Sequence, residues 1–153
     1  MATTTASLTI TSNDLVGDAL SLSTSNELNK AGTTVGLDQT TGMATAYLTA
    51  TTQIDLFNPV RTAAADAGKN CWVYVCNNST DETEYATIKI ANQTIGRLYA
   101  GDFIWMPWNR SERFVDISLT PSVATGMYFD YGLFYESIEH LASTDARTFT
   151  DEL

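Results

Sequence analysis

Residues 93–108 have the sequence QTIGRLYAGDFIWMPW, in which two apolar runs meet at Ala100-Gly101-Asp102. Gly101 can adopt the positive φ of a tight turn, and Asp102 can hydrogen-bond the turn backbone. The run after the turn is apolar on both of its faces, which is typical of a strand that is covered on both sides. This stretch therefore predicts a β-hairpin around which the core is organised.

The predicted hairpin contains Trp105 and Trp108, two of the three tryptophans of the chain, and the third is Trp72. Tryptophans within apolar strand runs favour a core position, and the alternative is a platform on which sugars stack. With Trp105 in the core, its replacement by alanine is expected to lower the free energy of unfolding by roughly 3–5 kcal/mol. Pro107 has no N–H to donate, so strand pairing is expected to end or bulge there.

Short runs of strand composition follow one another along the chain, with polar or charged turns between them. They lie at 53–57, 71–77, 85–91, 94–99, 103–108, 114–120 and 128–135. Strands of this length and spacing predict an all-β fold, an antiparallel β-sandwich of jelly-roll type. The alanine-rich segment 61–68 predicts one short helix.

The N-terminal third of the chain is rich in threonine and poor in aromatic residues. Leu8 and Ile10 alternate with polar residues, and so do Leu20 and Leu22. This pattern predicts either short strands or an extended arm, at residues 1–12, that becomes ordered on a partner.

The length of 153 residues is typical of one domain. We predict a β-sandwich domain over residues 1–136 and an extended C-terminal tail over 137–153. The tail either grips a neighbouring subunit or is a solvated end.

The chain is strongly acidic, with 18 Asp and Glu against 8 Lys and Arg and a net charge of −10. The phosphate backbone favours cationic surfaces, so nucleic-acid binding and binding to an anionic membrane are not expected. The acidity indicates either solubility alone or an electrostatic match to a basic partner. The first residues lack the features of a signal peptide, and no stretch has the length of a membrane span, which predicts synthesis in the cytoplasm.

The two cysteines, Cys71 and Cys76, lie in one predicted strand at an odd spacing. An odd spacing sends them to opposite faces, so they cannot form a disulfide with each other. No histidine lies near them in the sequence, which also argues against zinc. We predict two free, buried thiols in a reducing compartment.

No catalytic, cofactor-binding or metal site is predicted, and the chain is not expected to be an enzyme. His140 is the only histidine, and no Gly-x-Ser-x-Gly elbow accompanies it. The positions and spacing of the acidic residues favour solvated roles over acid–base catalysis on a glycan or loose calcium binding. These residues are Asp81, Glu82, Glu84, Asp102, Asp116 and Asp130.

A resemblance covers most of residues 7–136. It rests on SLTITSNDLVGDALSLSTSNELNKAGTTVGLDQTTG (7–42), GRLYAGDFIWMPW (96–108), DISLTPSVAT (116–125) and YFDYGLFYE (128–136). These segments resemble small virion structural proteins of tailed bacteriophages, those of aquatic phages in particular. Residues 137–153 have no counterpart in that group.

The resemblance implies a β-rich capsid cement or decoration protein, made in the host cytoplasm and located on the capsid surface of the virion. Its expected partners are the major capsid protein and further copies of itself. A tail or head-fibre component is the structural alternative, and copy number per particle separates the two. A glycan-binding adhesion module is the alternative of a different class.

Overall fold

The structure, a computed structural model, describes residues 3–17, 19–58, 69–109 and 115–136. Within these ranges the chain forms eleven strands and no helix. The strands are β1 (Thr5–Ser12), β2 (Leu20–Glu27), β3 (Gln39–Thr40), β4 (Ala44–Leu48), β5 (Ile54–Phe57), β6 (Cys71–Asn77), β7 (Tyr85–Ile90), β8 (Gln93–Tyr99), β9 (Phe103–Pro107), β10 (Ile117–Pro121) and β11 (Met127–Tyr135). The predicted helix at 61–68 and the predicted tail at 137–153 lie outside the described residues.

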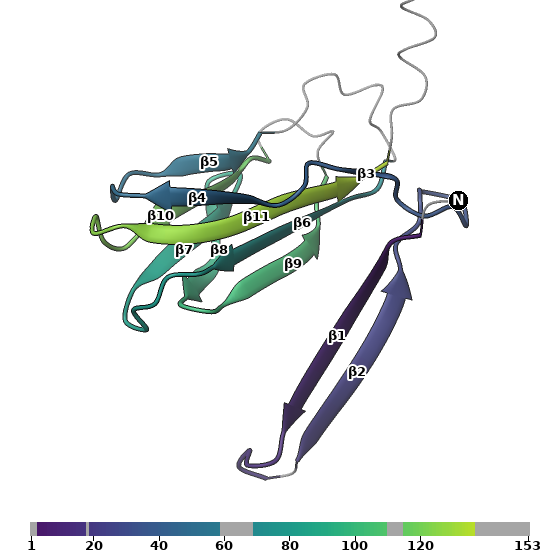
Figure 1. Cartoon of the computed structure of the whole chain (residues 1–153), viewed down its shortest axis with the longest axis horizontal. Helices are drawn as coiled ribbons and strands as arrows, with labels where there is room; N and C mark the ends of the chain where they lie inside the picture. Colours follow the sequence, from purple (N-terminus) through teal and green to yellow (C-terminus); the bar gives the residue numbers. More distant parts are fainter. Residues whose placement is uncertain (1–2, 18, 59–68, 110–114, 137–153) are drawn as a thin grey trace, which may run out of the picture.

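Two antiparallel sheets pack face to face as a sandwich (Figure 1). One sheet has the strand order β5-β10-β7-β8. In the other, β3 and β4 follow each other along one side of β11, and β6 and β9 continue the sheet on its other side. The predicted all-β antiparallel sandwich is confirmed, and the jelly-roll topology stays a prediction. No helix in the described ranges is long and apolar enough to cross a membrane.

The core lies between the two sheets, because alternate residues of each strand point inward. Val73 and Val75 of β6 are fully buried, whereas Trp72 and Tyr74, which alternate with them, are only half-buried. Apolar residues from both sheets make up the core: Phe57, Cys71, Val73, Val75, Ala86, Ile88, Leu98, Trp108, Ile117, Leu119, Met127 and Phe129.

β8 and β9 do not form the predicted hairpin with each other, so that prediction is wrong. β8 pairs with β7 in one sheet, and β9 pairs with β6 in the other. Gly101, with a φ of 84°, therefore lies in an arch that carries the chain between sheets. The Gly101 N–H donates to the carbonyl of Asn77 at 2.8 Å, and the Asn77 N–H donates to the carbonyl of Asp102 at 3.0 Å. These bonds to the end of β6 take the place of a hairpin ladder.

The tight hairpin of this region lies between β7 and β8. Its two connecting residues, Ala91 and Asn92, have φ angles of 51° and 63°. Positive φ at both positions is the mark of a type I′ turn, whose twist matches that of the flanking strands. Asparagine tolerates this conformation, but for alanine it costs on the order of 1 kcal/mol.

Replacing Ala91 by asparagine is expected to raise the free energy of unfolding by about 0.5–1 kcal/mol, because asparagine adopts a positive φ more readily. Equilibrium urea unfolding measures the change. Ala100→Asn is the matched control, since Ala100 also lies in a turn but is not among the residues with positive φ. A gain of the same size in both variants would contradict the explanation.

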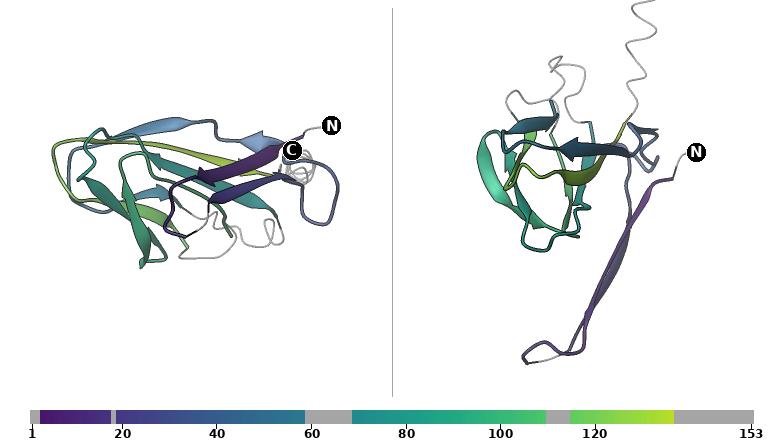
Figure 2. Two further views of the ribbon diagram at one scale, coloured as in Figure 1. Left: turned by 90° about the horizontal axis from the view of Figure 1, so that it is seen from below. Right: turned by 60° about the vertical axis from the view of Figure 1, so that its left-hand side comes forward.

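β1 and β2 form a ribbon of their own that projects from the sandwich (Figures 1 and 2). The two strands pair antiparallel over their full length, from Thr5 opposite Glu27 to Ser12 opposite Leu20. We call this ribbon, Thr5–Glu27, the arm. The sequence predicted either short strands or an extended arm at residues 1–12. The structure has a strand there, β1, and this strand belongs to the projecting arm.

Candidate functional site

The two faces of the arm differ in chemistry. Residues that pair across an antiparallel ribbon point to the same face, and Ile10 pairs with Leu22. Leu8, Ile10, Leu20 and Leu22 therefore share one face, where each is 39–44% exposed. The opposite face carries hydroxyl groups only along most of its length: Thr5, Ser7, Thr9, Thr11, Ser21, Ser23 and Ser25.

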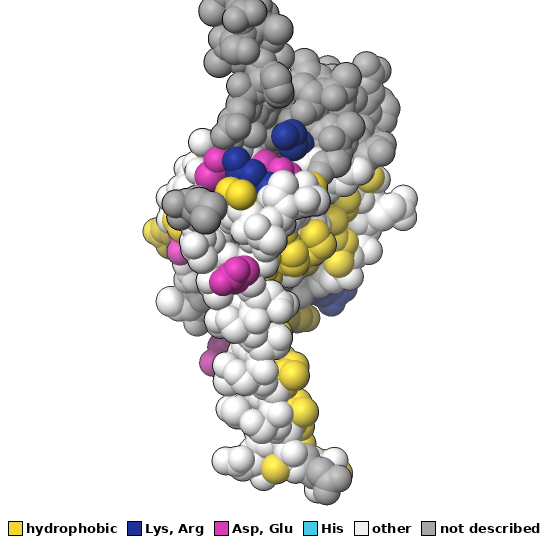
Figure 3. Space-filling view, turned by 90° about the vertical axis from the view of Figure 1, so that its right-hand side faces the viewer, with side chains coloured by type: hydrophobic (Ala, Val, Ile, Leu, Met, Phe, Trp, Pro, Cys, Tyr) yellow, Lys and Arg dark blue, Asp and Glu magenta, His cyan; other side chains and the backbone are white. Residues whose placement is uncertain are grey.

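The distal part of the arm exposes apolar side chains without a covering element in the described part of the chain. Figure 3 shows a line of apolar side chains along one side of the projecting ribbon. At the tip, Leu15 is 51% exposed and Val16 is fully exposed. We call Ile10, Leu15, Val16, Leu20 and Leu22 the distal arm surface. A two-stranded ribbon is marginally stable on its own, and exposed apolar side chains of this density mark interaction surfaces.

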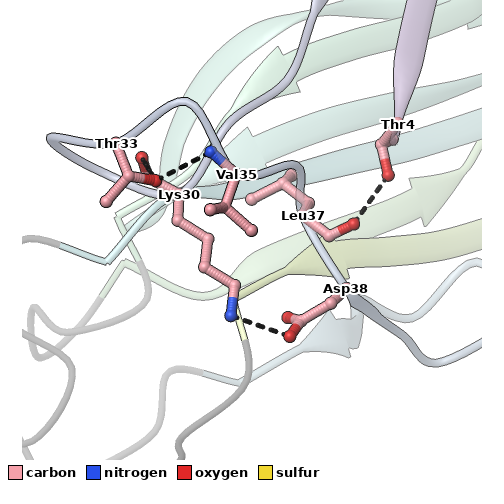
Figure 4. Close-up of polar contacts among 6 residues, drawn as sticks. All are labelled: Thr4, Lys30, Thr33, Val35, Leu37 and Asp38. Carbon is pink, nitrogen blue, oxygen red and sulfur yellow. Dashed lines mark hydrogen bonds and ion pairs between the residues drawn. The ribbon is translucent and has the colours of Figure 1, made fainter. Parts of the chain in front are cut away.

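A compact loop, residues 28–38, holds the base of the arm (Figure 4). The hydroxyl of Thr4 donates to the carbonyl of Leu37 at 2.8 Å, and the N–H of Leu28 donates to the carbonyl of Thr4 at 2.7 Å. Leu28 and Leu37 are both buried, and Lys30 forms an ion pair with Asp38 at 2.8 Å. The loop therefore has a small apolar centre of its own that holds both ends of the arm.

One side-chain hydrogen bond ties this loop to the sandwich. The amide of Asn70 donates to the carbonyl of Asn29 at 2.9 Å. The backbone N–H of Asn70 in turn donates to a carboxylate oxygen of Glu136, which is 3% exposed. Asn70 comes directly before β6 and Glu136 directly after β11, so the arm is attached where two central strands meet.

The outer face of the five-stranded sheet carries a group of aromatic rings beside the arm. Trp72 and Trp105 are stacked with their ring centroids 5.3 Å apart, and Phe134 meets Trp105 edge-on at 5.4 Å. Tyr74 and Phe103 are stacked at 6.2 Å. We call these five residues the aromatic platform. They come from β6, β9 and β11, which lie side by side in the sheet.

The platform corrects the prediction that all three tryptophans lie in the core. Trp108 is in the core and is 6% exposed, but Trp72 and Trp105 are only half-buried. Alternation along β9 turns Trp105 and Phe103 away from the other sheet, and Phe103 is 55% exposed. The outward face of β9 is therefore apolar, although no sheet covers it in the described part of the chain.

A cleft of about 1030 Å³ separates the platform from the proximal part of the arm. The arm contributes Leu8 and a rim of polar side chains that includes Thr24, Asn26 and Glu27. No hydrogen bond within the described part of the chain occupies the side chains of Thr24 and Asn26. Glu27 is the one charged residue among those that line the cleft.

Of the acidic residues considered from the sequence, Asp81, Glu84, Asp102 and Asp130 make structural hydrogen bonds away from the cleft. The Asp102 carboxylate accepts from the N–H of Tyr99 at 2.9 Å within the arch. Asp130 accepts hydrogen bonds from the side chains of Thr45 and Asn78, which joins β4, β11 and the end of β6. Bonds from Thr83 to its carboxylate lower the pKa of Asp81, as is usual for an acid that stabilises a turn.

The other candidate groups are the two cysteines and residues that are not described. Cys71 and Cys76 are both buried, and neither forms a disulfide, as predicted. Burial raises the pKa of Tyr74, which lies beside Cys76, with further contributions from Cys76 and Asp130. Among the described residues no group of three or more His, Cys, Asp or Glu side chains is arranged to hold a metal ion. His140 lies outside the described residues.

Comparison with known protein families finds no model that matches the chain, and none of the curated proteins matches it. Two exposed surfaces of the structure indicate where the protein binds its partners or ligands. One is the distal arm surface. The other is the aromatic platform with its cleft.

Proposed function

We propose that this chain is a virion structural protein of a tailed bacteriophage, a capsid cement or decoration protein that binds the head shell through its arm. The observation that carries the proposal is the distal arm surface, where apolar side chains project from the sandwich with no cover in the described part of the chain. The segments that resemble small phage virion proteins include residues 7–27 of the arm and, in the sandwich, β9, β10 and most of β11.

The arm is suited to docking on a folded neighbour. Both of its outer edges have unpaired backbone groups, since among the described residues β1 and β2 pair only with each other. Such edges can add to a sheet of another protein, while the apolar face enters a groove beside it. The partner is the major capsid protein, and neighbouring copies of this chain contact one another on the shell.

The charge distribution agrees with an arm that binds the shell and a sandwich that remains in solvent. The strands of the arm contain a single charged residue, Glu27, although the chain has a net charge of −10. Glu27 pairs with Thr5 on the hydroxyl face, so the apolar face of the two strands carries no charge. That face can be buried against a partner without desolvating charges. The acidic sandwich then remains on the outer surface of the virion, where its charge favours solubility.

The proposal is structural rather than catalytic. A protein that binds only the assembled shell stabilises it by mass action, and many weak contacts add up over a lattice. Such a protein therefore needs a folded domain and an element that extends from it to the shell. The sandwich and the arm supply these.

The test uses shells of the phage assembled without this protein. Purified protein is expected to bind at a fixed, symmetry-related number of sites and to raise the disassembly temperature of the shells. The variant Ile10→Ser/Leu20→Ser/Leu22→Ser is expected to bind on the order of 100-fold more weakly, because three half-exposed side chains no longer bury apolar area. The control Thr9→Ala/Thr11→Ala/Ser23→Ala changes the opposite face and is expected to bind nearly as well.

Two outcomes would count against the proposal. Saturation at a handful of sites per particle would assign the protein to the tail or to a head fibre. Equal binding by the triple serine variant and the unchanged protein would remove the arm from the interface. Circular dichroism of each variant confirms that the sandwich remains folded.

A further inference from the structure

The aromatic cleft is separate from the surface used in the proposed function. The distal arm surface begins at Ile10, whereas the cleft is lined by the arm only up to Leu8 on β1 and back to Thr24 on β2. A partner can therefore hold the distal part while the cleft stays open. The cleft has the size of a pocket for a ligand of several rings, since small-molecule sites measure roughly 300–1000 Å³.

The two walls of the cleft offer complementary chemistry. On one side, the platform presents the half-buried rings of Trp72 and Trp105 and the exposed ring of Phe103. On the other side, the arm presents the hydroxyl of Thr24 and the amide of Asn26, whose hydrogen-bonding groups are unused in the described part of the chain. A ligand that fits needs an apolar face and polar groups around its edge.

A sugar ring meets both requirements. One face of a pyranose presents C–H groups that pack on an indole, and its hydroxyls lie at the ring edge, within reach of amides and hydroxyls. Nucleic-acid bases also stack on aromatic rings, but their phosphates need cations. The described lining contains no Lys or Arg, and its one charged group is the carboxylate of Glu27. The same charge argues against acidic sugars.

We infer that the cleft between the aromatic platform and the proximal arm is a binding site for a neutral oligosaccharide, with Trp105 as the stacking surface and Asn26 as a hydrogen-bonding group. On a shell surface such a site would attach the particle weakly to glycan. Many copies on one lattice would raise the overall avidity well above that of a single site.

An array of neutral and acidic oligosaccharides, probed with the purified full chain, tests the inference. We expect binding to neutral members and a change in tryptophan fluorescence when the best of them is titrated in solution. Trp105→Ala is expected to weaken binding at least about tenfold, and Asn26→Ala about three- to tenfold. Asn26 is exposed, so its variant keeps the test valid if loss of Trp105 disturbs the fold.

Tyr128→Ala is the matched control. Tyr128 is 49% exposed on the outer face of the same sheet and stacks on Tyr47 at 4.5 Å, but it does not line the cleft. Its replacement is expected to leave sugar binding unchanged. The inference is overturned if no neutral oligosaccharide binds, if only acidic ones bind, or if Tyr128→Ala weakens binding as much as Trp105→Ala does.

The experiment also separates this inference from the proposed function. The triple serine variant of the arm keeps Leu8, Thr24 and Asn26, so it is expected to bind sugar normally while it loses the shell. Trp105→Ala is expected to do the reverse. If Trp105→Ala also lost the shell, the platform would belong to the shell contact, and the sugar site would be overturned.

Discussion

Replacing Trp108 by alanine is expected to lower the free energy of unfolding by about 3–5 kcal/mol, the cost of removing a large buried aromatic side chain. Trp108 is 6% exposed and packs on Phe57, with ring centroids 6.0 Å apart. Its indole N–H donates to the carbonyl of Val115 at 2.8 Å, and this carbonyl loses its partner in the variant. Both the cavity and the lost hydrogen bond act in the same direction.

Urea unfolding followed by far-UV circular dichroism measures this loss, and Trp105→Ala is the matched comparison. Trp105 lies three residues earlier but on the outer face, where it is only half-buried. Its replacement is expected to cost about 1–2 kcal/mol, because less apolar area is lost from the folded state. This value replaces the larger cost expected from the sequence. Equal losses in the two variants would show that both tryptophans belong to one core.

Replacing Asn77 by alanine is expected to lower the free energy of unfolding by about 2–4 kcal/mol, because one buried and one partly buried backbone group lose their partners. Asn77 is 0% exposed at the end of β6. Its side-chain amide donates to the carbonyl of Leu98 at 3.0 Å, and its side-chain oxygen accepts from the N–H of Ser79 at 2.9 Å. The first of these bonds links β6 of one sheet to β8 of the other.

The same unfolding measurement, with Asn26→Ala as its control, checks this prediction. Asn26 is exposed in the arm and its side chain has no hydrogen bond within the described part of the chain, so its replacement is expected to change stability by less than about 0.5 kcal/mol. A similarly small effect at Asn77 would mean that water or a shifted backbone satisfies the two groups. The arch at Gly101 would then hold without this side chain.

The alternation of residues along the chain was enough to predict the class of fold. The spacing of apolar residues in β6, β10 and β11 predicted strands, and the odd spacing of Cys71 and Cys76 predicted two free thiols. These are local properties. A side chain in a strand points to the opposite face from its neighbour, whatever the strand pairs with. The alternation of Leu8, Ile10, Leu20 and Leu22 with polar residues left short strands and an extended arm open, and it did not indicate that two paired strands would project.

Which strands pair with each other, and which face of each strand is buried, were determined only by the tertiary structure. The sequence around Gly101 is that of a tight turn, and a tight turn serves a hairpin and an arch between sheets equally well. The side chain and backbone of Asn77, distant in sequence, select the arch. Trp105 and Trp108 belong to one apolar run, yet one lies on the platform and the other in the core. Alternation states that two faces differ, but only the packing of the second sheet determines which of them is buried.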